Sequence, residues 1–455
     1  MTTRRTLLKG ALALPLVPLG LSACSDSSPN RYLANNFAPV DIESTITDLE
    51  VTGTLPADLI GRFLRNGPNP SGSVSESSYH WFVGDGMVHG IRLNGGRAEW
   101  YRNRYVGGSG ANTNVIGHAG RTTAIVESGG MPHDMGYNLE SVGDNTAIGG
   151  GFSAHPKLDV DTGELHAMCY DWASLRDHVR YVVIGADGEL AAETEVSLPG
   201  MPMIHDMSLT ENYAVVFDLP VTLSFLALGT GSQLPFRWDN EYEPRVGLLP
   251  RDGESGDIIW SPLQPNYTYH PMNAYEDESG QVVIDVCRYD RMFENDVRGP
   301  FGDSLPRLDR WTVNPKTRTV NEQVVDARPQ EFPRIHPALN GKLYRYGYTV
   351  GVAEYGFPSI YKQDLLTGSA AQFDVGAGRH SAEPVFVPRE GSQAEDDGYL
   401  MAFVYDEGKD TSDLVILDAQ DLARGAIATV HLPVRVPYGF HGNWVPDSVT
   451  PPAAA

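Results

Sequence analysis

A short hairpin unit recurs along this chain and constrains the fold more than any other feature. In each unit a polar residue opens an apolar run, a turn containing Gly or Asn follows, and a second apolar run ends at Asp or another turn former. Clear copies begin at His155, His205, His270 and Glu383. The opening residues are separated by 50 residues (His155 to His205), 65 (His205 to His270), 52 (Glu331 to Glu383) and 58 (Glu383 to His441).

This quasi-period predicts an all-β, seven-bladed β-propeller. Four-stranded units bury one sheet face on the next, and a body of about 415 residues with units of about 58 residues gives about seven blades. The 48 glycines and 32 prolines are spread along the whole chain, as many tight turns require. A two-domain β-sandwich is the alternative. The polar residue repeated at the inner start of a strand favours the propeller, because such positions converge on its axis.

Charge and composition exclude several other classes of protein. The chain has 34 Lys and Arg against 58 Asp and Glu, a net charge of −24, which argues against a nucleic-acid partner. No apolar run reaches the roughly 18 residues of a membrane span. Three cysteines are too few for a disulfide scaffold.

Residues 1–23 have the features of an export signal. Arg4 and Arg5 match the twin-arginine pattern, Gly10–Leu21 is an apolar stretch of 12 residues, and Leu21–Cys24 resembles a bacterial lipobox. We therefore expect cleavage before Cys24, lipidation of its thiol, and a periplasmic or cell-envelope lipoprotein held at a membrane surface by its lipid anchor. An ordinary secretory signal with a chance Arg pair and a chance Cys is the alternative.

The rest of the chain divides simply. We expect a polar tether over residues 25–36, the propeller over 37–450 and a disordered tail over 451–455. Loss of Arg4, Arg5 and Lys9 with the signal changes the net charge from −24 to −27.

Four of the 13 histidines stand at matching strand starts: His155, His205, His270 and His441. Imidazole nitrogens suit iron, zinc, copper and nickel, so their joint pattern predicts a metal site on the propeller axis. Four neutral histidines leave the metal charge uncompensated, and carboxylates are then needed to accept the other ring N–H and set the tautomer. The candidates are Glu127, Glu331 and Glu383, which we interpret as opening segments of the same type.

The motifs around these residues resemble those of the carotenoid cleavage oxygenase family, which includes retinal pigment epithelial membrane protein and the lignostilbene dioxygenases. The resemblance covers the chain from about residue 37 onward. It begins with FLRNGPNP (Phe63–Pro70) and HWFVGDGMVHG (His80–Gly90). It continues with AIVESGG around Glu127, FSAHPKLD around His155, IHDMSLTENYAVV around His205, YHPMNAYE around His270, EFPRI around Glu331, EPVFVPR around Glu383 and YGFHGNWVP around His441.

The resemblance implies a fold and a chemistry. In the family the equivalent histidines hold one Fe²⁺ on the axis of a seven-bladed propeller that carries a helix and loop dome over one face, and the equivalent glutamates support them. The reaction would be oxidative cleavage of a carbon–carbon double bond by dioxygen to two carbonyl products, with a hydrophobic alkene as substrate. No catalytic side chain beyond the metal centre is then required.

The substrate class is less constrained by the motifs. The stilbene-cleaving branch pairs a lysine beside the glutamate with a tyrosine, whereas the neighbour of Glu127 is Val126, which favours a carotenoid or apocarotenoid. A stilbenoid or phenylpropenoid cleaver and a non-catalytic, lipid-binding iron propeller are the alternatives. Possible substrate-lining residues are Tyr101, Tyr105, Phe63 and Phe332.

Overall fold

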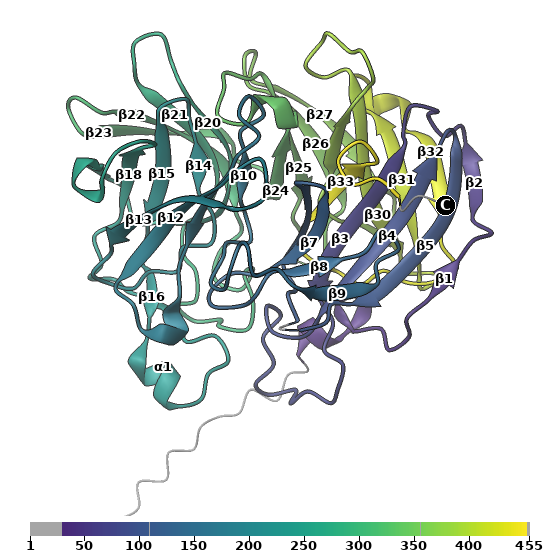
Figure 1. Cartoon of the computed structure of the whole chain (residues 1–455), viewed down its shortest axis with the longest axis horizontal. Coiled ribbons are helices and arrows are strands. Elements are labelled where there is room, and N and C mark those ends of the chain that lie inside the picture. Colours follow the sequence, from purple (N-terminus) through teal and green to yellow (C-terminus); the bar gives the residue numbers. More distant parts are fainter. Residues whose placement is uncertain (1–29, 109, 355, 453–455) are drawn as a thin grey trace, which may run out of the picture.

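The computed structural model describes residues 30–108, 110–354 and 356–452, and within them seven β-sheets stand around a central axis (Figure 1). Each sheet is an antiparallel blade, numbered here along the chain. The predicted all-β, seven-bladed propeller is therefore confirmed. Among the described residues, no helix is both long and apolar enough to span a bilayer.

Blade 1 mixes strands from both ends of the chain, whereas blades 2 to 4 are built from consecutive segments. From the axis outward, blade 1 contains β33 (Gly442–Pro446), β3 (Gly61–Pro68), β4 (Gly86–Asn94), β5 (Arg97–Tyr105) and β1 (Thr45–Ile46). Blade 2 contains β6 (Asn114–His118), β7 (Arg121–Ile125), β8 (His133–Met135) and β9 (Ser141–Asp144). Blade 3 contains β10 (Lys157–Leu158), β11 (Leu165–Cys169), β12 (His178–Ile184) and β13 (Leu190–Ser197), and blade 4 contains β14 (Ser208–Leu209), β15 (Tyr213–Asp218), β18 (Arg245–Pro250) and β19 (Ile259–Pro262).

The remaining blades follow the same plan until the circle closes. Blade 5 contains β20 (Tyr267–Glu276), β21 (Val282–Tyr289), β22 (Arg307–Asn314) and β23 (Thr319–Asp326), and blade 6 contains β24 (Gln330–Ile335), β25 (Tyr346–Gly351), β26 (Ser359–Asp364) and β27 (Ser369–Asp374). In blade 7, β28 (Arg379–Ser381) and β29 (Val385–Pro388) both pair with β30 (Gly398–Asp406), followed by β31 (Thr411–Asp418), β32 (Ala426–His431) and β2 (Glu50–Gly53).

Closure uses both ends of the chain. The last strand, β33, pairs with β3 from Gly61↔Pro446 to Arg65↔Gly442, and the early strand β2 pairs with β32 from Glu50↔His431 to Gly53↔Ala428. The C-terminal strand thus completes the first blade and an N-terminal strand completes the last one, which closes the propeller and leaves only short, protected sheet edges.

Burial follows the position of a strand within its blade. Strands near the axis, such as β3 and β21, are buried at every residue because neighbouring blades cover both faces. Outer strands such as β13 and β27 are mostly exposed. Hydrophobic side chains between blades form the core, with Val215, Ile284 and Trp311 fully buried in its largest cluster.

Loops cover one end of the axis, and they form most of the expected dome. The one α-helix among the described residues is the short α1 (Phe225–Gly229), which lies beside the hairpin of β16 (Val221–Leu223) and β17 (Phe236–Trp238) at the lower left of Figure 1. The other helical elements among the described residues are short 3-10 turns: η1 (Arg31–Leu33), η2 (Asn35–Phe37), η3 (Trp172–Ser174), η4 (Ser255–Asp257), η5 (Pro337–Leu339) and η6 (Leu422–Arg424).

The predicted tether over 25–36 is wrong for its described part. Asn30 and Tyr32 are buried, and the Asn30 side chain donates to the Tyr79 carbonyl and accepts from the Tyr32 N–H. The Tyr32 ring stacks on Trp81 at a centroid distance of 5.7 Å. Aromatic packing and capping therefore fold residues 30–36 onto the propeller. The signal, Cys24 and residues 453–455 lie outside the described residues, and Pro451 and Pro452 are exposed and irregular.

Candidate metal centre and adjoining cavities

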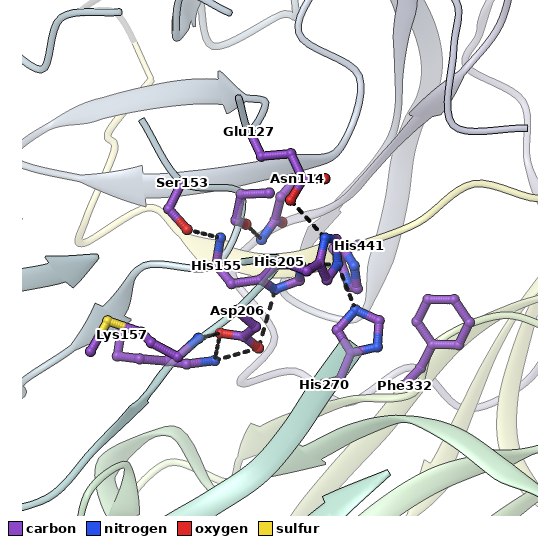
Figure 2. Close-up of polar contacts among 12 residues, drawn as sticks. Asn114, Glu127, Ser153, His155, Lys157, His205, Asp206, His270, Phe332 and His441 are labelled. Atoms are coloured by element: carbon purple, nitrogen blue, oxygen red, sulfur yellow. Dashed lines mark hydrogen bonds and ion pairs between the residues drawn. The ribbon is translucent and has the colours of Figure 1, made fainter. Parts of the chain in front are cut away.

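The four predicted histidines converge on the axis from four blades. His155 precedes β10, His205 precedes β14, His270 lies within β20 and His441 precedes β33. All four are buried, and one nitrogen of each lies within 4.8 Å of the others (Figure 2). Each of these strands is the innermost strand of its blade. The starts of the innermost strands therefore lie together around the axis.

The spacing of the ring nitrogens fits a metal ion. Nε2 of His205 lies 3.0 Å from Nε2 of His155 and 3.1 Å from Nε2 of His270. Nitrogens about 2.1 Å from a metal and at right angles to one another are about 3.0 Å apart. Without a cation these lone pairs would repel, so the donor set fits a divalent metal bound by Nε2 atoms.

Three of the histidines are oriented by glutamates. Nδ1 of His205 lies 2.7 Å from Glu127 Oε2, Nδ1 of His270 lies 2.7 Å from Glu331 Oε2, and Nδ1 of His441 lies 3.0 Å from Glu383 Oε1. Each Nδ1–H donates to the carboxyl oxygen that it faces, and each Nε2 is left free to bind a metal.

The structure places Glu127 differently from the sequence interpretation. Glu331 lies within the inner strand β24 and Glu383 just before β29, but Glu127 follows β7, the second strand of its blade. In an antiparallel hairpin, the end of the second strand lies beside the start of the first, so both positions reach the axis. The residue that opens the inner strand β6 is Asn114.

Among the residues that the structure describes, no glutamate contacts His155. Its Nδ1 atom lies 3.7 Å from Oδ2 of Asp206, a buried carboxylate that sequence reasoning missed. Asp206 accepts from Lys157 Nζ, at 2.8 Å on Oδ1 and 3.0 Å on Oδ2, and from the Met207 N–H at 2.6 Å. Its place directly after His205, on the opposite side of the chain, was the available signal.

Burial disfavours the protonated form of three of the four histidines. Burial, together with the neighbouring histidines, lowers the pKa of His155 and His270 well below the usual range, and burial also lowers the pKa of His441. Neutral imidazoles are the form that ligates a metal. Burial raises the pKa of Glu331 to about 8, whereas the pKa of Glu383 is lowered because Arg334 and His441 outweigh its burial.

An apolar cavity of about 300 Å³ lies on one side of the histidines. Phe332, in the left-handed backbone region at φ 52°, stacks on the His270 ring at 5.4 Å and forms part of its wall. The wall is largely aromatic and includes Trp81, Phe82, Tyr170, Trp172, Tyr269, Tyr289, Phe332 and Phe440. Val126 also lines it, and its described lining residues include no Lys or Arg.

Three of the four suggested lining residues lie elsewhere. Phe63 and Tyr101 pack in the core between blades 1 and 7, where the Tyr101 hydroxyl is 2.9 Å from His89 Nδ1. Tyr105 accepts a hydrogen bond from the Asn69 side chain at 2.8 Å. None of these three is among the lining residues, so only Phe332 keeps its assigned place.

Tyr170 and Tyr289 were missed, although a signal was present. Tyr170 follows β11 and Tyr289 ends β21. Each therefore closes the second strand of a hairpin whose first strand begins at or carries a ligand histidine. Glu127 has the same position in blade 2, where the first strand opens with Asn114. The position that ends the second strand is thus a second set of residues directed toward the site.

A polar cavity of about 200 Å³ lies on the other side of the histidines. The two cavities share His270 and His441. Residues just before these histidines, such as Tyr269 and Phe440, line the apolar cavity, whereas residues after them, such as Met272 and Asn443, line the polar one. The inner strands thus run from the apolar side to the polar side, with the nitrogen cluster between.

Comparison with known proteins agrees with this architecture. The family model for retinal pigment epithelial membrane protein matches residues 37–110 and 107–446. A carotenoid cleavage oxygenase of Mycobacterium tuberculosis is 43% identical over 94% of this chain and all of the relative. An apocarotenoid-15,15'-oxygenase of Synechocystis is 31% identical over 92% of this chain and 96% of the relative.

Solved structures show the same fold. Pseudomonas brassicacearum lignostilbene dioxygenase superposes with a TM-score of 0.84 at 27% identity, and cobalt-substituted Synechocystis ACO with 0.81 at 28%; each covers 92% of this chain and 99% of the other. With this match along the propeller and four converging histidines, the chain belongs to the carotenoid cleavage oxygenase family.

Proposed function

We propose that this protein is a nonhaem iron(II) dioxygenase that cleaves a carbon–carbon double bond of a carotenoid or apocarotenoid. The observation that carries the proposal is a cluster of four buried histidines, three of which line an aromatic cavity that has no Lys or Arg among its described lining residues. One dioxygen and one alkene would give two carbonyl products, one oxygen atom going to each, so no external reductant is consumed.

His155, His205, His270 and His441 would hold the iron, which would supply dioxygen binding and activation beside the alkene. The glutamates hold the Nδ1 protons of His205, His270 and His441 and fix the ring planes. The aromatic wall orients a polyene and excludes water, and its ring faces stabilise positive charge that develops along the substrate.

A stilbenoid substrate is the second candidate, because one structural relative is named a lignostilbene dioxygenase. The cavity argues against it for this chain. A 4-hydroxyl bound as phenolate needs a nearby cation, whereas Val126 is apolar and the described lining contains neither Lys nor Arg. An apolar polyene needs no such partner.

A product panel tests the proposal. Iron-loaded protein is incubated under dioxygen with apocarotenals, carotenoids and hydroxystilbenes, and products are identified by mass spectrometry. Aldehydes from the polyenes support the proposal, and ¹⁸O₂ is expected to label both products. Aldehydes from the stilbenes alone would identify a stilbenoid cleaver, and binding without products would identify a lipid-binding propeller. His205→Ala is expected to lose stoichiometric iron.

We further propose that the protein is exported and anchored through Cys24. Tyr32 stacks on Trp81, and Trp81 lines the apolar cavity. The N-terminal segment that follows Cys24 therefore packs beside that cavity. Five residues lie between Cys24 and Asn30, so a fully extended chain spans at most about 22 Å between them. An anchor would therefore hold the cavity near a membrane that contains polyenes. Labelling with a fatty-acid probe, lost in Cys24→Ala, tests this; equal labelling of both forms would contradict it.

A further inference from the structure

The polar cavity beneath the histidines continues toward the surface. It shares Leu158, Arg334, Pro337 and Asn443 with a third cavity of about 640 Å³ on the same side of the propeller. Leu158, in β10, is 37% exposed and lines both spaces. The histidine cluster therefore has two approaches: the aromatic cavity on one side and this axial passage on the other.

Charged and amide side chains line the passage next to the histidines. Asp206 and Glu383 are 4% and 5% exposed, and each has one cationic neighbour. Lys157 pairs with Asp206, and Nη1 of Arg334 lies 3.5 Å from Glu383 Oε1. Figure 2 shows Lys157 and Asp206 beside His155. Carboxylate and amide oxygens of this kind can replace the water molecules of a cation one at a time.

The aromatic cavity offers a cation much less. Its two carboxylates, Glu127 and Glu331, are hydrogen-bonded to His205 and His270, as Glu383 is to His441 in the passage, so the contrast lies in the remaining walls. The rest of its lining is mainly aromatic and aliphatic, with Asn112, Thr113, Ser128 and Gln233 as polar exceptions, and moving a divalent ion past apolar walls without replacing its hydration is costly. A bound polyene would also fill this space.

We infer that the axial passage is the route by which the divalent metal ion enters and leaves the four-histidine centre. This inference rests on the proposed metal centre but not on its substrate. The passage separates the traffic of a hydrated cation from that of a hydrophobic alkene. Its inner part, next to the histidines, is polar, whereas its wider outer part is lined mainly by apolar side chains such as Val160, Phe386 and Val445.

Arg334 controls this passage. Its side chain lines both the polar cavity and the third cavity, and Nη2 donates to Asn443 Oδ1 at 2.6 Å while Nη1 faces Glu383. A guanidinium at this junction repels an incoming cation and equally opposes its departure. It therefore acts as a kinetic barrier that retains the metal.

Two matched substitutions test the route. Leu158→Trp narrows the axial passage, and Leu234→Trp narrows the aromatic cavity, which Leu234 lines. Loading of folded apo-protein with Co²⁺, followed by visible absorption, gives the association rate. Transfer of Co²⁺ from loaded protein to excess chelator gives the dissociation rate.

Leu158→Trp is expected to slow both rates by the same factor, about 10-fold, with unchanged equilibrium affinity. Leu234→Trp is expected to leave both rates unchanged. An equal change in both directions identifies a barrier on the path, whereas distorted ligands would change the affinity. Slowing by Leu234→Trp alone, or slowing by neither variant, would overturn the inference.

Arg334→Gln tests the same passage by removing the proposed electrostatic barrier. Removal of the cation is expected to raise the association rate about 10-fold, with a smaller effect at higher salt. Arg328→Gln is the control, because Arg328 pairs with Asp326 and is not among the residues that line the passage. An unchanged rate in Arg334→Gln would overturn the role of Arg334. Wild-type protein that binds no Co²⁺ or Fe²⁺ at equilibrium would instead contradict the proposed function itself.

Discussion

Nδ1 of His155 lies 3.7 Å from Oδ2 of Asp206, a full ångström farther than Nδ1 of His205 lies from Glu127, at 2.7 Å. Asp206 is not free to approach, because Lys157 contacts both of its oxygens. The four histidines are thus supported unequally: three by direct hydrogen bonds to glutamates, and one by a carboxylate already committed to a lysine.

This unequal support predicts that two conservative substitutions affect different properties, metal affinity in one case and stability in the other. Glu331→Gln is expected to weaken metal affinity about 10- to 100-fold, because it replaces the carboxyl acceptor of the His270 Nδ1–H by an amide. Asp206→Asn is expected to change affinity much less but to lower the free energy of unfolding of the apo-protein by about 2 kcal/mol, because Lys157 loses its buried partner. Metal titration and chemical denaturation of both variants check the contrast, and a larger affinity loss in Asp206→Asn would refute it.

The hairpins and the histidine cluster were predictable because they depend on local pattern. Turn residues separate apolar runs, and each run begins at the axis, so equivalent positions in successive units converge. Glu127 was harder, since it ends a second strand instead of opening a first one. A rule that pairs the two ends of each hairpin would have found Glu127, Tyr170 and Tyr289 together.

Positions set by long-range closure were not predictable. The C-terminal strand β33 inserts inside β3, so β3 becomes the second strand of blade 1, and Phe63 pairs with Trp444 away from the cavity. Tyr101 lies in β5, two strands farther from the axis than β3, although its sequence context is aromatic. Such a displacement depends on a partner that is almost 400 residues away and leaves no local signal.

The buried N-terminal segment predicts a link between residues 30–36 and the apolar cavity. Tyr32→Ala is expected to lower the free energy of unfolding by about 3 kcal/mol and to raise KM, because Trp81 loses its stacking partner and the cavity wall loosens. Tyr32→Phe keeps the ring and serves as the control. Thermal denaturation and steady-state kinetics measure both effects; an unchanged KM in Tyr32→Ala would show that the wall is held by other contacts.

Acid sensitivity is expected from buried histidines outside the metal centre. Burial, assisted by Arg251, lowers the pKa of His166 to about 4, and its Nδ1 is 2.8 Å from the Tyr181 hydroxyl. The unfolded chain therefore binds this proton more readily than the folded one. Stability from this group is complete above about pH 6.5 and is lost as pH falls toward 4, by about 3 kcal/mol in total.

His166→Gln removes this titration while keeping a polar side chain of similar size. Chemical denaturation between pH 7 and 4 is expected to give a shallower loss of stability for the variant than for the wild type, with the difference confined to that window. A pH dependence identical to that of the wild type would show that the folded protein tolerates a charged His166.

Val126 predicts how the substrate class can be altered. Val126 lines the apolar cavity beside Glu127, so Val126→Lys places a cation there next to the carboxylate that orients His205. We expect cleavage of an apolar apocarotenoid to fall at least 10-fold, because a desolvated ammonium without a ligand partner is costly. Cleavage or binding of a 4-hydroxystilbene is expected to rise relative to cleavage of the apocarotenoid, since a phenolate would neutralise the new charge.

Val126→Met, of similar length but uncharged, controls for volume and is expected to retain the polyene preference. A Val126→Lys variant whose ratio of stilbene to polyene cleavage equals that of Val126→Met would show that charge at this position does not set the preference.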